Sequence, residues 1–125
     1  MDVREIKTYR QAEEYILEVP KFTSKNPLEE TRGFYQFLQE HDYKEEKLGK
    51  IIHIAGTNGK GSVCSFINSV CLESGYHVGM FTSPHLITMR ERFIIDGEMI
   101  SEEAFLDAFL LLLLKNLFTK LFDFA

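Results

Sequence analysis

Apolar residues along the first forty positions recur every three or four residues, as they do in amphipathic helices. The segment 8–19 opens with a Thr-x-x-Gln capping-box pattern, and its apolar repeat stops at Pro20. A second repeat opens at Asn26-Pro27, which suit the N-cap and N1 positions of a helix, and continues to Leu38. The pattern therefore predicts two helices, and we interpret residues 1–50 as an N-terminal helical prelude.

A strand-like pattern begins after this prelude. Ile51–Ala55 is a short apolar run rich in β-branched residues, typical of a strand buried on both faces of a parallel sheet. Beyond a glycine-rich segment, a helical apolar stripe starts at Val63, and Gly75 is a favoured residue for ending that helix. Val78–Phe81 supplies a second short strand. This order predicts a βαβ unit with a right-handed crossover.

The last third of the chain predicts a hairpin and another helix. Arg92–Ile95 and Glu98–Ile100 flank Asp96-Gly97, a pair that favours a two-residue hairpin turn. Ser101 is suited to cap a helix, and two glutamates follow it in the first turn. From Phe109 onward, leucines and phenylalanines follow one another without a clear polar face.

Composition narrows the classes of protein to consider. The chain has 125 residues, 45% of them hydrophobic, and a formal net charge of -5. Binding to nucleic acid phosphates needs a basic face, so we expect no nucleic acid partner. The longest apolar run, Ala108–Leu114, is well short of the roughly 20 residues of a membrane-spanning helix, so we expect no membrane association. The charged N-terminus lacks a signal-peptide pattern, which indicates a cytoplasmic location.

The glycine-rich segment has the residues of a phosphate-binding loop. It lies between a predicted strand and a predicted helix, where backbone N–H groups and the helix dipole converge on an anion. Lys60 is suited to neutralise the β and γ phosphates, and Ser62 to reach a phosphate or its Mg²⁺. The spacing departs from the general G-x-x-x-x-G-K-[ST] pattern because a glycine separates these two residues. We predict that this segment binds nucleotide phosphates; from the glycine cluster alone, an ordinary glycine-rich turn is the alternative.

Several motifs of the chain occur together in one known family. They are Gly56–Ser62 (GTNGKGS), Thr82–Leu86 (TSPHL), Glu91–Phe93 (ERF) and Asp96-Gly97. In order and spacing they resemble the folylpolyglutamate synthase/dihydrofolate synthase branch of the Mur ligase superfamily, and the resemblance covers roughly residues 8–108.

The resemblance implies an α/β fold. Residues 51–125 would form the start of a phosphate-loop parallel-sheet ATPase domain, similar to the central domain of Mur ligases but incomplete, behind the helical prelude of residues 1–50. Members of the family are much longer, so the chain is interpreted as an N-terminal fragment, inactive or nearly so by itself. One hypothesis is that the leucine-rich end is the out-of-frame or degraded end of a longer gene.

The resemblance also implies site residues and substrates. In the family the phosphate loop holds ATP, which implies an ATP site formed by Thr57, Asn58, Gly59, Lys60, Gly61 and Ser62, with Lys60 as the catalytic residue. Ser83 would help to hold a catalytic Mg²⁺, and its loop would form part of a folate pocket. In the reaction of the family, ATP phosphorylates a carboxylate of dihydropteroate or a folate, and the amine of L-glutamate then displaces phosphate. The folate-binding residues implied are Thr82, Ser83, Pro84, His85 and Leu86.

Other interpretations of these residues stay open. From residue types alone, Thr82–His85 is an ordinary capped turn, and Arg90 and Arg92 are either solvated charges or contacts to an anion. At the level of function, the alternatives are a different phosphate-loop ATPase or kinase, and a non-catalytic module that binds nucleotide or folate.

Overall fold

The computed structural model describes residues 3–18, 27–41 and 45–123. The chain divides into two compact units: one is Met1–Ile51 together with Leu106–Ala125, and the other is Ile52–Phe105. Pro20 and Asn26, at the predicted end of one helix and start of the next, lie outside the described residues.

The first unit is helical, as the sequence predicts. The capping box of α1 is formed, because Thr8 Oγ1 accepts the N–H of Gln11 at 3.2 Å and Gln11 Oε1 accepts the N–H of Thr8 at 3.1 Å. Behind this cap, Ala12 is fully buried and Tyr15 packs edge-on against Phe109, with ring centroids 5.8 Å apart. The unit contains 3₁₀ helices η1 (Val3–Glu5) and η2 (Glu45–Leu48), helices α1 (Tyr9–Glu18) and α2 (Pro27–Glu40), and most of α4 (Glu102–Asp123).

Helix α4 confirms the predicted start at Ser101, whose hydroxyl accepts the N–H of Ala104 at 3.0 Å. The helix continues through the leucine-rich segment that has no clear polar face. Within the described ranges, no helix is long and apolar enough to cross a membrane.

The second unit contains a three-stranded antiparallel sheet, with the order β1 (Gly79–Phe81), β2 (Phe93–Ile95), β3 (Glu98–Met99). The predicted hairpin is confirmed: Asp96 and Gly97 have φ values of 50° and 85°, the left-handed pair that a tight hairpin turn requires. Phe81 lies opposite Phe93 in the register, and their ring centroids are 5.2 Å apart.

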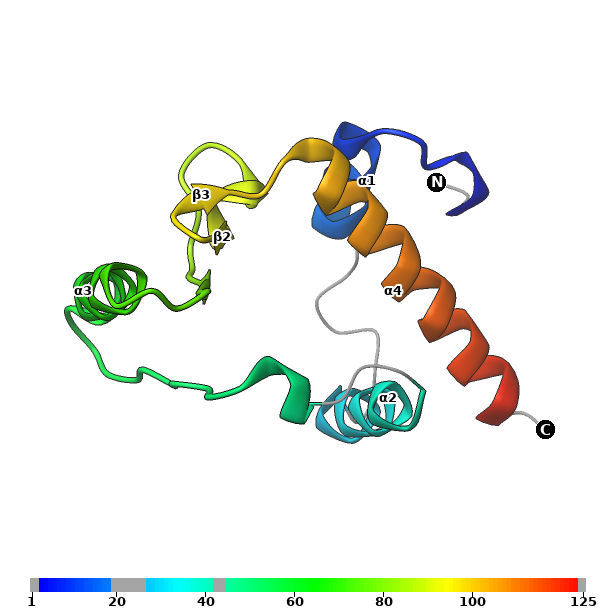
Figure 1. Ribbon diagram of the computed structural model, residues 1–125. Coiled ribbons are helices and arrows are strands. Elements are labelled where there is room, and N and C mark those ends of the chain that lie inside the picture. The colour runs from blue at the N-terminus through cyan, green and yellow to red at the C-terminus, as the bar shows by residue number, and fades with distance from the viewer. Residues whose placement is uncertain (1–2, 19–26, 42–44, 124–125) are drawn as a thin grey trace. The chain divides into compact units, whose positions relative to one another are not determined.

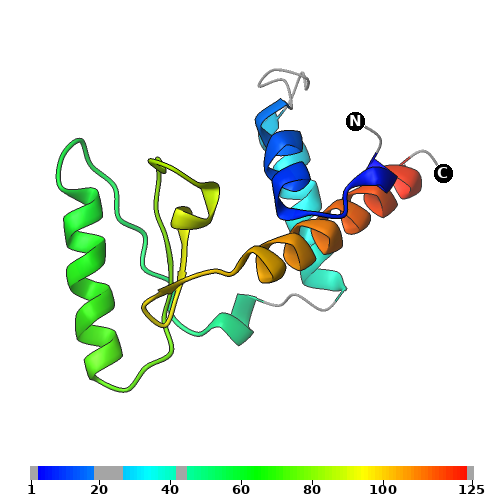
Figure 2. The same ribbon diagram turned by 90° about the horizontal axis from the view of Figure 1, so that it is seen from above.

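Helix α3 (Lys60–Glu73) also belongs to this unit, and Figure 2 shows it beside the sheet. It ends as predicted at Gly75, whose φ of 88° allows a Schellman motif. The N–H of Tyr76 donates to the carbonyl of Cys71 and that of Gly75 to the carbonyl of Leu72, both at 3.0 Å. Leu72 also lies beside the hairpin turn, since a Cβ placed on Gly97 would be 3.5 Å from its Cδ1.

The predicted βαβ unit is not formed. Ile51–Ala55 is not a strand, and Ile51 and Ile52 are each 60% exposed. The predicted strand at Val78–Phe81 does form as β1, but it pairs antiparallel with β2, and the sheet of the described residues has no parallel pair. A buried parallel strand needs neighbours that supply its backbone hydrogen bonds, and none lies beside Ile51–Ala55 in this part of the chain.

Candidate functional site

The predicted phosphate loop leads into the N-terminus of α3. Gly59 is the N-cap residue and has a φ of 75°, a left-handed conformation that suits glycine. No side chain caps the helix. The first backbone N–H groups of an α-helix have no partner within it, so those of Lys60, Gly61 and Ser62 are available to an anion.

The loop is also open to solvent. All residues from Thr57 to Ser62 are exposed, and a Cβ at Gly59 or Gly61 would have no atom within 4 Å. The Lys60 side chain folds back over the loop, and its Nζ donates a hydrogen bond to the carbonyl of Gly56. A positive charge, free amides and an accessible hydroxyl thus lie within one short segment, which is the chemistry that binds nucleotide phosphates.

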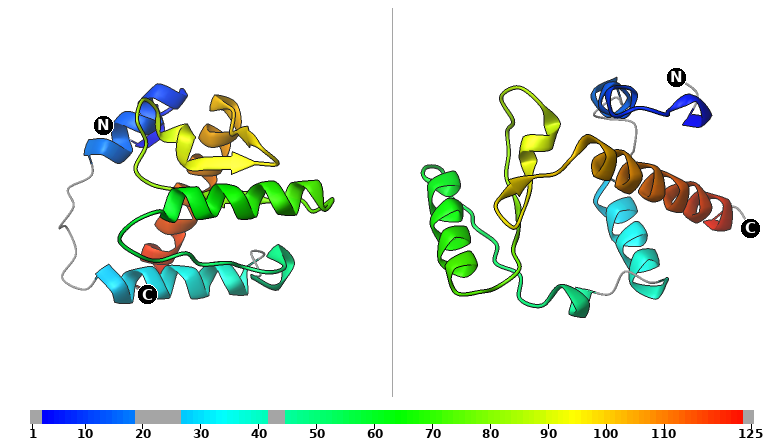
Figure 3. Two further views of the ribbon diagram at one scale, coloured as in Figure 1. Left: turned by 90° about the vertical axis from the view of Figure 1, so that its left-hand side faces the viewer. Right: turned by 45° about the horizontal axis from the view of Figure 1, so that its top comes forward.

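The second predicted motif, Thr82–Leu86, lies in the wide loop that links β1 to the 3₁₀ helix η3 (Met89–Arg92) (Figure 3). Two of its residues are tied to Arg92. The N–H of Thr82 donates to the Arg92 carbonyl at 3.1 Å, and Arg92 Nε donates to His85 Nδ1 at 2.8 Å. His85 is half-buried, whereas Ser83 and Pro84 are exposed.

Glu91 organises the far end of the same loop. Its carboxylate accepts the backbone N–H groups of Leu86, Ile87 and Thr88 at 3.1, 2.8 and 2.6 Å. These bonds stabilise the ionised form, so the pKa of Glu91 lies below its usual range, with the Thr88 amide as the largest cause. Sequence reasoning left Glu91 without a role, although Thr88-x-x-Glu91 is itself a capping-box pattern and could have revealed the bond between these two residues.

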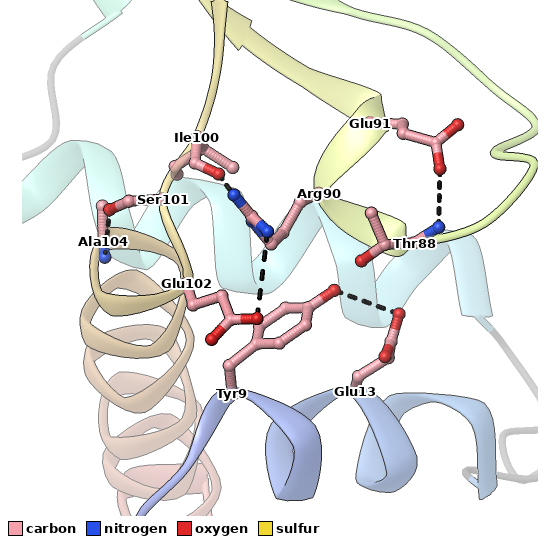
Figure 4. A network of polar contacts seen from close by, with 9 residues as sticks. All are labelled: Tyr9, Glu13, Thr88, Arg90, Glu91, Ile100, Ser101, Glu102 and Ala104. Atoms are coloured by element: carbon pink, nitrogen blue, oxygen red, sulfur yellow. Dashed lines mark hydrogen bonds and ion pairs between the residues drawn. The ribbon is translucent and has the colours of Figure 1, made fainter.

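Arg90 lies on the other side of η3, as Figure 4 shows. Its Nε donates to the carbonyl of Ile100 at 2.8 Å, and its Nη1 lies 3.9 Å from Glu102 Oε1. Arg90 and Arg92 both have partners within the chain. The structure therefore indicates that Arg90 and Arg92 stabilise this unit, and does not favour the interpretation of them as solvated charges.

The two predicted site segments both belong to the unit Ile52–Phe105, although α3 separates them in the sequence. In the described chain, no hydrogen bond or ion pair joins residues 56–62 to residues 82–86. The structure thus presents two separately formed loops. One has free amides and a lysine; the other has an exposed serine and backbone amides that are hydrogen-bonded to Glu91 and Arg92.

The donor atoms of these loops fit Mg²⁺ only in part. Ser62 and Ser83 offer hydroxyl oxygens, which are hard donors of the kind that Mg²⁺ prefers. Among the residues that the structure describes, no group of three or more His, Cys, Asp or Glu side chains could hold a metal ion. The ion would therefore need phosphate oxygens and waters as most of its ligands, as it does in many ATP sites.

The chain is similar in sequence to known proteins. No family model matches the chain. It is 47% identical over 90 residues to "Folylpolyglutamate synthase" from Arabidopsis thaliana, covering 72% of this chain and 14% of that protein. It is 44% identical over 78 residues to "Dihydrofolate synthase/folylpolyglutamate synthase" from Buchnera aphidicola, covering 58% and 19% respectively.

Solved structures agree with these relatives. Folylpolyglutamate synthetase from Lactobacillus casei superimposes with a TM-score of 0.71 at 31% identity, over 95% of this chain and 29% of the other. A structure described as an FPGS-AMPPCP-folate complex gives 0.70 at 30% identity, over 95% and 28%. The chain thus spans less than a third of each relative that it matches.

Proposed function

Because the chain belongs to the folylpolyglutamate synthase/dihydrofolate synthase family, we propose that it carries the nucleotide-binding part of an ATP-dependent ligase. The full reaction would join L-glutamate to dihydropteroate or to a folate. The observation that carries the proposal is the uncapped N-terminus of α3, where free amides, Lys60 and Ser62 meet in one exposed loop.

The proposed ATP site is the segment Thr57–Ser62. The amides of Lys60, Gly61 and Ser62 would hold the β and γ phosphate oxygens, and the positive end of the α3 dipole favours the same negative charge. Lys60 Nζ would exchange its bond to the Gly56 carbonyl for a phosphate oxygen. A solved FPGS structure described as a complex with AMPPCP, an ATP analogue, supports ATP as the nucleotide.

Ser83 and its neighbours are proposed to serve the second substrate and the metal. The folate-binding segment would be Thr82–Leu86, and the Ser83 hydroxyl would be one ligand of Mg²⁺. When bound, Mg²⁺ supplies positive charge beside the transferred phosphoryl group. The folate named with the same solved complex supports a folate-type ligand for this family.

The chemistry needs little from the protein beyond position and charge. A carboxylate oxygen of the folate or dihydropteroate attacks the γ phosphorus, the bond to the β-phosphate oxygen breaks, and ADP leaves. The glutamate amine then attacks the acyl phosphate, loses a proton and releases phosphate to form the amide. Lys60 and the α3 amides contribute to the first step by neutralising charge on the phosphoryl group. We propose that ligation also requires parts of the relatives that this chain does not span.

Calorimetric titration with Mg-ATP tests the proposed site. Lys60→Ala removes the only side-chain charge of the loop, and we expect saturable binding to weaken by about tenfold or more. Lys50→Ala is the matched control, because this exposed lysine lies outside the loop, and its affinity should equal that of the unmodified chain. Equal binding by both variants, or no binding by the unmodified chain, would contradict an ATP site at Thr57–Ser62.

A further inference from the structure

The loop between β1 and η3 is fixed by hydrogen bonds to its main chain, and not by burial of the side chains at its tip. Leu86 and Ile87 are each 91% exposed, so these two apolar residues contribute almost no hydrophobic anchoring to the loop. An exposed loop without such an anchor is ordinarily among the most mobile parts of a fold. The conformation at Leu86 and Ile87 therefore depends on polar contacts to their main chain.

Glu91 supplies those contacts. Three consecutive amides, those of Leu86, Ile87 and Thr88, converge on its two carboxylate oxygens, with Oε1 taking the first and Oε2 taking the other two. Hydrogen bonds to an ionised carboxylate are stronger than those between neutral groups. The lowered pKa of Glu91 keeps it ionised across the neutral range.

Arg92, the next residue, holds the opposite end of the same loop. Its carbonyl accepts the N–H of Thr82, and its guanidinium donates to His85. Glu91 and Arg92, two consecutive residues of η3, thereby contact both ends of the segment Thr82–Thr88. The exposed residues Ser83 and Pro84 lie between these attachment points.

We propose that Glu91 is the positioning residue of the substrate loop, setting the backbone of Leu86–Thr88 so that Thr82–Leu86 is preformed for its ligand. The proposal rests on the folate role given to Thr82–Leu86 above. Glu91 itself acts through the loop amides and does not touch the ligand. A preformed loop lowers the conformational entropy that is lost on binding, so loss of the carboxylate should weaken folate-type ligands and leave nucleotide affinity unchanged.

The test compares Glu91→Gln, Glu91→Ala and the control Glu98→Gln. The glutamine keeps one acceptor oxygen and loses the other, because an amide nitrogen cannot accept, so at least one loop amide loses its partner. Glu98 is an exposed glutamate on β3 of the same sheet. The first readout is amide hydrogen exchange at Leu86, Ile87 and Thr88, and the second is calorimetric affinity for dihydropteroate in saturating Mg-ATP.

We expect exchange at these three amides to accelerate by about tenfold or more in Glu91→Ala, and by less in Glu91→Gln. Dihydropteroate affinity should fall by about tenfold, while Mg-ATP affinity and the exchange of α3 amides stay unchanged. If Glu91→Ala unfolds, amide exchange will be faster throughout α3. In that case the exchange and affinity of Glu91→Gln test the proposal.

Two results would overturn the proposal. Unchanged exchange at Leu86–Thr88 in both Glu91 variants would show that the carboxylate does not set the loop. Faster exchange with unchanged dihydropteroate affinity would show that the preformed loop does not serve the ligand. Failure of the proposed ATP site would appear separately, as loss of Mg-ATP binding in the unmodified chain, and the exchange measurement does not depend on it.

Discussion

Val78 and Asp96 are joined by two hydrogen bonds. The N–H of Asp96 donates to the Val78 carbonyl at 2.8 Å, and the N–H of Val78 donates to Asp96 Oδ1, also at 2.8 Å. The second oxygen of the carboxylate lies 3.1 Å from His77 Nδ1. The turn between β2 and β3 is thereby fastened to the residues that precede β1, 18 positions earlier in the sequence.

This relationship predicts a pH dependence of stability. The Val78 amide, and after it the hydrogen bond with His77, lower the pKa of Asp96 in the folded chain. Because the folded pKa lies below the unfolded value of about 3.9, ionised Asp96 stabilises the fold at neutral pH, and this contribution is lost as the pH falls through the lowered value. We expect Asp96→Asn to unfold at lower urea than the unmodified chain at pH 7, with the difference shrinking in acid.

The asparagine is the appropriate variant because it tolerates the positive φ of position 96, keeps one acceptor oxygen for the N–H of Val78 and removes the charge. Asp107→Asn is the control, since this exposed aspartate lies on α4. A difference between Asp96→Asn and the unmodified chain that stays constant from pH 7 into acid would contradict the role assigned to the ionised carboxylate.

Gly97→Ala should destabilise the chain by about 1–2 kcal/mol, because an L side chain resists a φ of 85°. Space is not the obstacle, since the added Cβ would be 3.5 Å from Leu72 Cδ1, an ordinary contact. Gly33→Ala is the matched control: it lies inside α2 with nothing within 4 Å, and there alanine should stabilise by about 0.5–1 kcal/mol. Thermal unfolding of both variants checks the opposite signs, and a stabilising Gly97→Ala would contradict the left-handed turn.

Arg90→Ala should cost more stability than Glu102→Ala. Arg90 is only 21% exposed and donates to the carbonyl of Ile100, so its removal leaves a part-buried acceptor without this partner, at a cost of about 1–3 kcal/mol. Glu102 is 65% exposed and 3.9 Å from Arg90, and exposed ion pairs contribute less than about 1 kcal/mol. Urea unfolding of the two variants measures how much stability each one loses. Equal losses in Arg90→Ala and Glu102→Ala would assign the stabilising role to the ion pair.

Ser62→Ala should weaken Mg-ATP binding by about two- to tenfold, the range expected for one lost hydrogen bond. Its hydroxyl is the one in the first turn of α3 that the proposed site assigns to a phosphate or to Mg²⁺. Ser69→Ala tests specificity, because Ser69 is an exposed serine further along the same helix. Calorimetry measures the Mg-ATP affinity of both variants. An equal loss of affinity in Ser62→Ala and Ser69→Ala would indicate a general effect on α3.

The amino-acid sequence by itself determined the features that arise within a few residues. The capping box at Thr8, the end of α3 at Gly75 and the hairpin turn at Asp96-Gly97 each form as predicted. These features depend on local φ preferences and on side chains that reach only the adjacent turn, so their signals are complete in the sequence. The motif residues that resemble the folylpolyglutamate synthase/dihydrofolate synthase family also lie in short segments, so the sequence alone reveals them.

Only the tertiary structure decided which backbone groups meet across longer distances. Ile51–Ala55 has the composition of a buried strand, yet it stays unpaired, and β1 takes β2 as an antiparallel partner. The sequence contained Thr88-x-x-Glu91, but not the convergence of the Leu86 and Ile87 amides on the same carboxylate. Pairing of strands and closure of loops depend on which partners are present in space, and residue types alone do not specify them.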